Sequence, residues 1–147
     1  MGINGVKWLD MVFFGEYQVS FSAPGRIVLP KKLRELLKGN IFILTKGFDN
    51  CLSGYDQDDW NERSKSLLNV SLLEKNELAN RRFLFASTVY LEIDDQGRFV
   101  IPKNMLSYSE IVDKAVVIGV GDHFEIWSPV NWQKYTQPTI VTSSKNK

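Results

Sequence analysis

Two segments of this chain repeat one another at a spacing of 72 residues, and this duplication constrains the fold more than any other feature. Gly25-Arg26 is followed three residues later by Leu29-Pro30, just as Gly97-Arg98 is followed by Ile101-Pro102. The same spacing relates residues 19–21 to 91–93, Tyr55 to Trp127 and Trp60 to Trp132. Agreement at one spacing over about forty positions indicates a duplicated module.

Each copy has the pattern of a strand, a turn, a second strand, a short helix and two further strands. Alternating apolar and polar residues predict the strands, and Ser, Pro, Asp and Gly mark the turns. Pro30 and Pro102 suit the first turn of a helix, because the N–H that proline lacks would be unpaired there. In the first copy we predict strands at 17–21, 27–29, 41–45 and 51–55, with a helix over 31–37 that Gly39 ends. In the second copy we predict strands at 89–93, 99–101, 116–120 and 124–127, and a final helix to Tyr135 that begins with the cap Ser128-Pro129.

The sequence between the two copies is helical. Residues 58–68 and 72–85 have helical patterns, and Ser71 with Glu74 matches a capping box. The apolar side chains of the second helix are expected on one face: Leu72, Ala79, Phe83 and Ala86. The connection is therefore expected to be ordered rather than a flexible linker.

These elements predict a β-rich α+β fold of two tandem, pseudo-symmetric modules with intervening and terminal helices. The expected parts are a variable N-terminal extension (1–10), a first module (11–56), a helical connection (57–86), a second module with a terminal helix (87–136) and a polar tail (137–147).

Composition excludes several classes of function. A net charge of +1 rules out a basic field over the whole surface, so nucleic-acid binding would depend on local clusters. One cysteine and one histidine are too few for a Cys/His zinc site or an internal disulfide. Apolar runs are too short to span a bilayer, and neither a signal peptide nor a myristoylation pattern is apparent, which predicts a cytoplasmic protein.

No pattern of an enzyme is found. The sequence has no Gly-x-Ser-x-Gly elbow and no glycine-rich phosphate loop, so neither catalysis nor a cofactor is expected. We interpret His123 as an exposed residue at the tip of a hairpin around Gly121-Asp122, and Cys51 as a small buried side chain. The pair Asp58-Asp59 is interpreted as the solvated N-terminus of a helix, where acidic side chains are favoured.

The two glycine-arginine turns are the strongest candidates for a binding site. Glycine allows a positive φ, so the arginine beside it can project from a rigid turn, and its planar fork suits phosphate oxygens or a guanine edge. Arg98 has Asp94 four residues before it, so the arginines either brace their turns internally or contact nucleic acid. A basic cluster follows the first turn and is either part of that site or a solvated helix face: Lys31, Lys32, Arg34 and Lys38.

Several separated segments, in the same order, resemble the MraZ family over roughly residues 11–135. In the first half these are Phe14-Gly15-Glu16-Tyr17, Gly25-Arg26-x-x-x-Pro30 and Lys46-Gly47-Phe48-Asp49-Asn50-Cys51-Leu52. In the second half they are Asp94-x-Gln96-Gly97-Arg98-x-x-Ile101-Pro102, Gly119-Val120-Gly121-Asp122-x-x-Glu125-Ile126-Trp127-Ser128-Pro129 and Trp132.

The resemblance implies two AbrB-like swapped-hairpin modules, each with an Asp-x-x-x-Arg signature. It implies a ring-shaped homo-oligomer at the nucleoid that binds repeated promoter boxes in double-stranded DNA and regulates, with repression expected, the bacterial division and cell-wall gene cluster. Arg26 and Arg98 would contact DNA, and Lys31, Lys32 and Arg34 would contact phosphates. Gly25 and Gly97 would shape the turns, and Ser22 and Asp94 would brace them. No membrane or small-molecule substrate is implied.

The chain departs from the family pattern at the first turn, where Ser22 stands in place of the aspartate. A serine can hydrogen-bond the turn backbone but offers Arg26 no carboxylate. Pro24 and Gln96 also stand where the family often has lysine. Three other classes stay open: a ring-forming structural or interaction protein, an enzyme, and an antitoxin. The antitoxin would be expected to carry a long toxin-binding tail, whereas twelve residues follow Tyr135.

Overall fold

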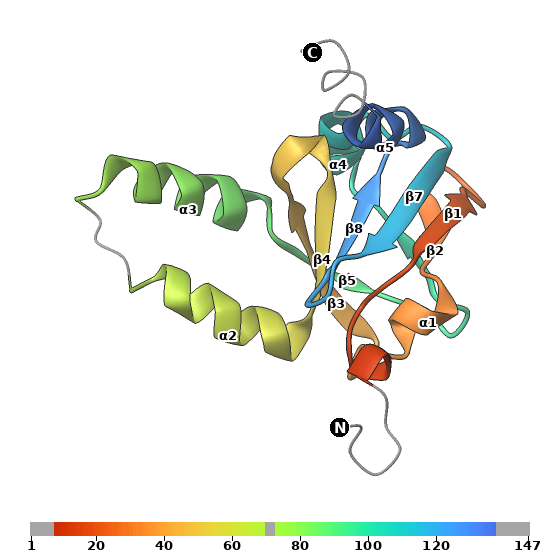
Figure 1. Ribbon diagram of the computed structural model, residues 1–147, viewed down its shortest axis with the longest axis horizontal. Coiled ribbons are helices and arrows are strands. Elements are labelled where there is room, and N and C mark those ends of the chain that lie inside the picture. The colour runs from red at the N-terminus through yellow and green to blue at the C-terminus, as the bar shows by residue number, and fades with distance from the viewer. Residues whose placement is uncertain (1–7, 70–72, 138–147) are drawn as a thin grey trace, which may run out of the picture.

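The computed structural model describes residues 8–69 and 73–137, which form a strand-rich α+β domain (Figure 1). Its strands are β1 Glu16–Ser20, β2 Arg26–Val28, β3 Ile41–Lys46, β4 Leu52–Asp56, β5 Val89–Glu92, β6 Arg98–Val100, β7 Lys114–Gly119 and β8 Phe124–Trp127. Its helices are α1 Lys31–Arg34, α2 Gln57–Leu67, α3 Lys75–Ser87, α4 Lys103–Ser109 and α5 Pro129–Thr136, with 3-10 turns η1 Trp8–Met11 and η2 Phe48–Asn50. None of the helices within these ranges is long and apolar enough to cross a membrane. The predicted N-terminal extension and polar tail lie largely outside the described residues.

The two halves exchange strands. Six strands form one sheet in the order β1-β7-β8-β4-β3-β5, and β2 pairs with β6 in a separate two-stranded ribbon. The strands β1, β3 and β4 of the first half correspond to β5, β7 and β8 of the second. When each strand is replaced by its counterpart, the same order results, read backwards. The sheet therefore has a pseudo-two-fold axis between β4 and β8. Because β1 pairs with β7 and β5 with β3, neither half completes its sheet alone. The prediction of a strand-rich α+β fold with two tandem, pseudo-symmetric modules is confirmed.

Both halves contribute to one hydrophobic core. Phe42 of the first half packs edge-on against Phe99 of the second, with ring centroids 4.9 Å apart. Phe42 also contacts Phe124, with centroids 5.6 Å apart, and all three rings are buried. Phe124 lies directly opposite Gly54 in the β4–β8 ladder, and its ring fills the space that a side chain at Gly54 would need. The shared core therefore locks the two halves together at the pseudo-two-fold axis.

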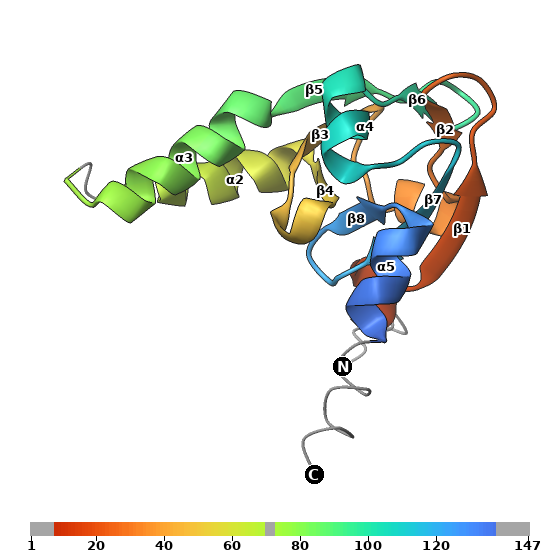
Figure 2. The ribbon, with the colours of Figure 1, turned by 90° about the horizontal axis from the view of Figure 1, so that it is seen from above.

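The helices α2 and α3 form a hairpin that projects from the body, as Figures 1 and 2 show. Aromatic contacts anchor its base: Trp60 of α2 packs on Tyr55 of β4 and on Phe85 of α3. A buried hydrogen bond of 2.8 Å between Thr45 and Ser87 ties α3 to β3. The connection is thus helical, as the sequence predicts, but it leaves the core instead of covering it.

The predicted start and the predicted apolar face of α3 both differ from the structure. The helix begins at Lys75 with Glu74 as its N-cap residue, rather than at Leu72 with Glu74 inside it. Ser71 and Leu72 lie outside the described residues. The predicted apolar face is also incomplete, because Ala79 and Ala86 are exposed on the projecting hairpin.

The first-half helix is shorter than predicted. α1 ends at Arg34 rather than Leu37, and Gly39 does not adopt a positive φ there. The amides of Leu36 and Leu37 bond to carbonyls three residues back, a tighter turn that directs both partly buried side chains against the core. The final helix agrees with its prediction, because the amide of Asn131 donates to Oγ of Ser128 at 3.0 Å.

Candidate nucleic-acid interface

The β2–β6 ribbon brings the two glycine-arginine turns together. Arg26 lies opposite Val100 and Arg98 lies opposite Val28, so these four side chains share one face of the ribbon. The opposite face carries Ile27, which is buried with Phe99 in the core. The amide of Leu29 donates to the carbonyl of Gly97, and that of Ile101 to the carbonyl of Gly25, both at 2.8 Å. Each turn is therefore held by the other half of the chain.

The second turn is braced by a carboxylate. Asp94 Oδ1 accepts the backbone N–H of Arg98 at 2.8 Å and that of Gln96 at 2.9 Å. Its Oδ2 accepts the Nε–H of Arg98 at 2.7 Å. The backbone N–H of Arg98, together with its guanidinium and the Gln96 N–H, holds the pKa of Asp94 below its usual range. The carboxylate therefore stays ionised and fixes both the turn and the direction of Arg98.

The first turn is braced by a hydroxyl. Oγ of Ser22 accepts the Nε–H of Arg26 at 3.0 Å and donates to the Arg26 carbonyl at 3.4 Å. The amide of Ser22 donates to the Arg26 carbonyl at 2.9 Å, as that of Asp94 does to the Arg98 carbonyl, but the Arg26 amide donates to the carbonyl of Ala23 at 3.0 Å and not to a side chain. Among the described residues no carboxylate pairs with Arg26. The two turns thus share one backbone hydrogen bond and a glycine of positive φ, but they differ in their other closing bonds and in charge.

Both turn glycines have a positive φ, 72° at Gly25 and 82° at Gly97. An L side chain would be strained at either position. A Cβ at Gly97 would also lie 2.5 Å from Cζ of Arg34, whose guanidinium covers this turn. The positive φ at each position is therefore the physical reason for the turn-shaping role predicted for both glycines.

The basic residues that follow the first turn differ in their exposure and in their neighbours. Lys31 and Lys32 are exposed on α1, and Lys32 lies 6.0 Å from the centre of the Phe14 ring. Arg34 is partly buried against the second turn. Lys38 is exposed and pairs with Asp58 at 3.6 Å, near the base of α2.

Three further residues of this region escaped the sequence analysis. Val28 and Val100 are exposed, at 36% and 54%, on the ribbon face between the two arginines. The alternation of these valines with Ile27 and Phe99, which are buried, is the sequence feature that could have predicted their exposure. Lys103 is exposed on α4 and is the equivalent of Lys31 at the 72-residue spacing.

The remaining candidates are structural. Cys51 is buried, as predicted, and burial raises the pKa of its thiol. Asp58 and Asp59 lie in the first turn of α2, as predicted. No group of three potential metal-ligating side chains occurs in the part of the chain that the structure describes.

The prediction of an exposed His123 is wrong. Its side chain is only 17% exposed and stacks on Tyr55, with ring centroids 4.6 Å apart. Asp122 lies 2.7 Å from Nδ1, and Glu125 lies 3.7 Å from Nε2. The β7–β8 loop folds against β4 and α2, which sequence spacing alone did not reveal.

Comparison with known proteins relates this duplicated, strand-exchanged domain to one protein family. Residues 12–83 and 84–147 each match the family described as "MraZ protein, putative antitoxin-like". The chain is similar to the proteins named "Transcriptional regulator MraZ" from Acetivibrio thermocellus (40% identity over 85% of this chain and 87% of the relative) and Alkaliphilus oremlandii (42% identity over 84% and 86%). The protein of the same name from Thermoanaerobacter sp. is 39% identical over 89% of this chain and 91% of that relative.

The fold defines a duplicated domain whose two halves exchange strands. The chain belongs to the MraZ family, as its sequence motifs predicted. This membership makes it a transcriptional regulator and not an enzyme.

Proposed function

We propose that this regulator binds double-stranded DNA sequence-specifically through the β2–β6 ribbon and its two turns. The observation that supports this proposal is that Arg26 and Arg98 lie on the same exposed face of one ribbon. A two-stranded ribbon is one of the elements that fit the major groove of B-DNA. The proposed targets are repeated boxes at promoters of the bacterial division and cell-wall gene cluster, with repression as the outcome in the bacterial cytoplasm, at the nucleoid.

Each part of the ribbon has a distinct role in this proposal. The forks of Arg26 and Arg98 bind guanine edges or phosphates, and exposed Val28 and Val100 offer apolar contact to thymine methyl groups. Lys31, Lys32 and Arg34 contribute phosphate contacts, which set affinity and position rather than sequence. Gly25 and Gly97 keep the turns narrow, and Ser22 and Asp94 hold them rigid.

We further propose that copies of the chain assemble into a ring. A groove of about 670 Å³ lies beside the base of the α2–α3 hairpin and is lined by aromatic side chains, among them Tyr55, Trp60, Trp132 and Tyr135. The hairpin itself projects far from the body (Figure 2). A projection and a groove on different parts of one surface suit a head-to-tail contact, which closes into a ring when the rotation allows. A ring presents many ribbons to repeated boxes, and linked sites raise avidity by about 10²–10⁴. This avidity makes up for the weak overall attraction to DNA of a chain whose net charge is only +1.

The test is a genome-wide capture of fragments bound by the purified protein, followed by a mobility-shift titration at several salt concentrations. We expect selective binding whose log–log salt slope is about −0.9 for each phosphate contact. Absence of binding to any fragment at low salt, or a flat salt response, would refute DNA binding. It would favour the alternative of a ring-forming structural or interaction protein whose arginines only brace their turns.

A further inference from the structure

The guanidinium of Arg34 has an unusual position. It leaves its own half of the chain and lies over the second turn, with Cζ 2.5 Å from the place of a Cβ at Gly97. Its Nε is buried and has no hydrogen-bond partner among the described residues. No ion pair with Arg34 is found within the described ranges either. The Nε is the one nitrogen of this guanidinium that is buried and unpaired among the described residues, so its two outer nitrogens stay accessible to an oxygen ligand from outside the chain.

The equivalent position in the other half is different. Leu106 lies 72 residues after Arg34, and its Cδ1 lies 3.6 Å from the place of a Cβ at Gly25. A leucine therefore covers the first turn where a guanidinium covers the second. The packing is equivalent, but only the second turn receives an additional positive charge.

This asymmetry coincides with the asymmetry of the braces. At the second turn the carboxylate of Asp94 occupies Nε of Arg98, whereas at the first turn Arg26 meets only the hydroxyl of Ser22. Each turn therefore has one arginine that no carboxylate engages. At the first turn it is Arg26 itself, and at the second it is Arg34 from the opposite half.

We propose that Arg34 is the phosphate-binding arginine of the second turn, supplied across the pseudo-two-fold axis, while Asp94 directs Arg98 toward the bases. This inference rests on the DNA binding proposed above. A DNA phosphate oxygen accepts from the outer Nη–H groups of Arg34, and the guanidinium offsets the negative charge that Asp94 places at this turn.

The test compares Arg34→Leu, Arg34→Lys and Leu106→Arg with the wild type. The probes are a duplex selected by the wild-type protein from a randomised DNA library and a random-sequence duplex of the same length. Arg34→Leu reproduces the packing that Leu106 already provides on the first turn, so the fold should persist. We expect it to bind both duplexes about tenfold more weakly, with a salt slope shallower by about 0.9 per engaged subunit. Arg34→Lys should keep the slope, and Leu106→Arg should steepen it.

Equal slopes for Arg34→Leu and the wild type, with unchanged thermal stability and oligomeric mass, would overturn the inference and leave Arg34 a packing residue. If Arg34→Leu does not fold, Arg34→Gln decides in the same way, because it keeps a long side chain with a planar head. Failure of the proposed function is distinguishable, since the wild type would then bind neither duplex.

Discussion

Asp94 accepts the Nε–H of Arg98 at 2.7 Å, whereas at the equivalent place Ser22 accepts the Nε–H of Arg26 at 3.0 Å. In the first contact both partners are charged, whereas in the second only the guanidinium is, so the contact of Asp94 is the stronger of the two. Asp94 also holds two backbone amides of its turn. Arg98 is therefore the better oriented of the two arginines.

We expect Arg98→Ala to reduce sequence-specific DNA affinity more than Arg26→Ala. A bidentate base contact is worth about 1–3 kcal/mol, and a fork held in direction loses less entropy on binding than one that is weakly held. The measurement is the ratio of affinities for a selected and a random duplex, for each variant at fixed salt. A larger loss of specificity in Arg26→Ala would show that freedom from a carboxylate matters more than orientation.

Ser22→Asp should narrow the difference between the two turns. The new carboxylate has the sequence position relative to Arg26 that Asp94 has to Arg98, and in both turns the amide of this residue donates to the carbonyl of the arginine. In this background Arg26→Ala should reduce specificity nearly as much as Arg98→Ala does. The matched control is Ser22→Asn, which can accept the turn amides without adding charge.

Gly54→Ala should destabilise the fold. A Cβ at Gly54 would overlap the ring of Phe124, its direct partner across the β4–β8 ladder, and overpacking of a core typically costs about 1–3 kcal/mol. The free energy of unfolding would be measured by urea denaturation at one protein concentration. Gly39→Ala is the control, because no atom lies within 4 Å of the added methyl and φ is not positive there. Equal stability of the two variants would contradict the close contact.

The sequence predicted most strands and both turns because they depend on local alternation and on residues such as Gly25 and Gly97. The 72-residue spacing also predicted that the halves would be equivalent. What it missed depends on contacts between distant segments. The stacking of His123 on Tyr55 and the covering of Gly97 by Arg34 both join different parts of the chain, and no periodicity reports them. The length of α1 was overestimated because burial of Leu36 and Leu37 overrides helix propensity there.

Tyr135→Asp should reduce the size of the assembly. Tyr135 is 56% exposed, lines the aromatic groove and contacts Trp127 and Trp132. We expect light scattering to give a mass above that of a dimer for the wild type and a lower mass for the variant, because a buried unpaired carboxylate opposes the contact. DNA avidity should fall with the mass.

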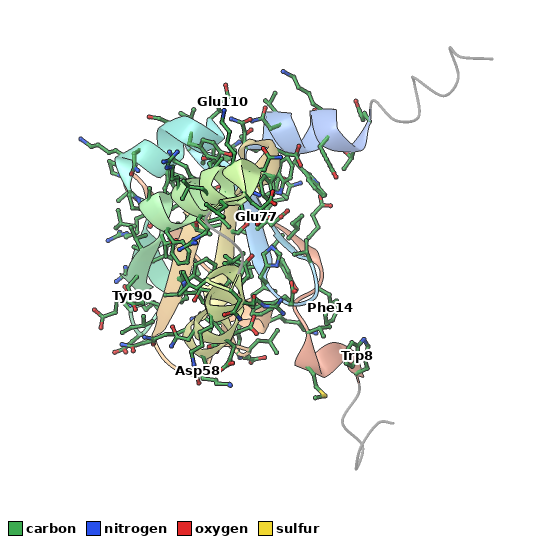
Figure 3. All side chains as sticks on the ribbon, turned by 90° about the vertical axis from the view of Figure 1, so that its left-hand side faces the viewer. Trp8, Phe14, Asp58, Glu77, Tyr90 and Glu110 are labelled. Atoms are coloured by element: carbon green, nitrogen blue, oxygen red, sulfur yellow. The ribbon has the colours of Figure 1, made fainter. Side chains whose placement is uncertain are left out.

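Val112→Asp provides the control for that experiment, since Val112 is 80% exposed and does not line the groove. The edge strands offer a second route to assembly, and Figure 3 shows Tyr90 of β5 and Phe14, just before β1, at opposite sides of the body. If Tyr135→Asp leaves the mass unchanged while a charge at Tyr90 lowers it, the contact uses a sheet edge instead of the groove.

The stability of the fold should decline as the pH rises through the pKa of His123. Burial lowers this pKa, but hydrogen bonds with Glu125 and Asp122 outweigh burial and raise it above the ordinary value. Arg63 of α2 also faces the cluster, through its ion pair with Asp122 at 3.0 Å. A raised pKa in the folded state means that the stabilisation is complete below the unfolded pKa of about 6.5 and is lost at higher pH.

The other groups of this cluster titrate outside that window. The pKa values of Asp122 and Glu125 are lowered by their bonds to His123 despite burial, and burial raises the pKa of Tyr55 to about 12. The measurement that checks this is the free energy of unfolding of the wild type and of His123→Phe between pH 6 and 9. Phenylalanine keeps the ring on Tyr55 but cannot take up a proton. The advantage of the wild type should shrink as the pH rises. Parallel curves for the two proteins would show that the imidazole does not change its charge on folding, and that the bond of His123 to Asp122 forms with the neutral ring.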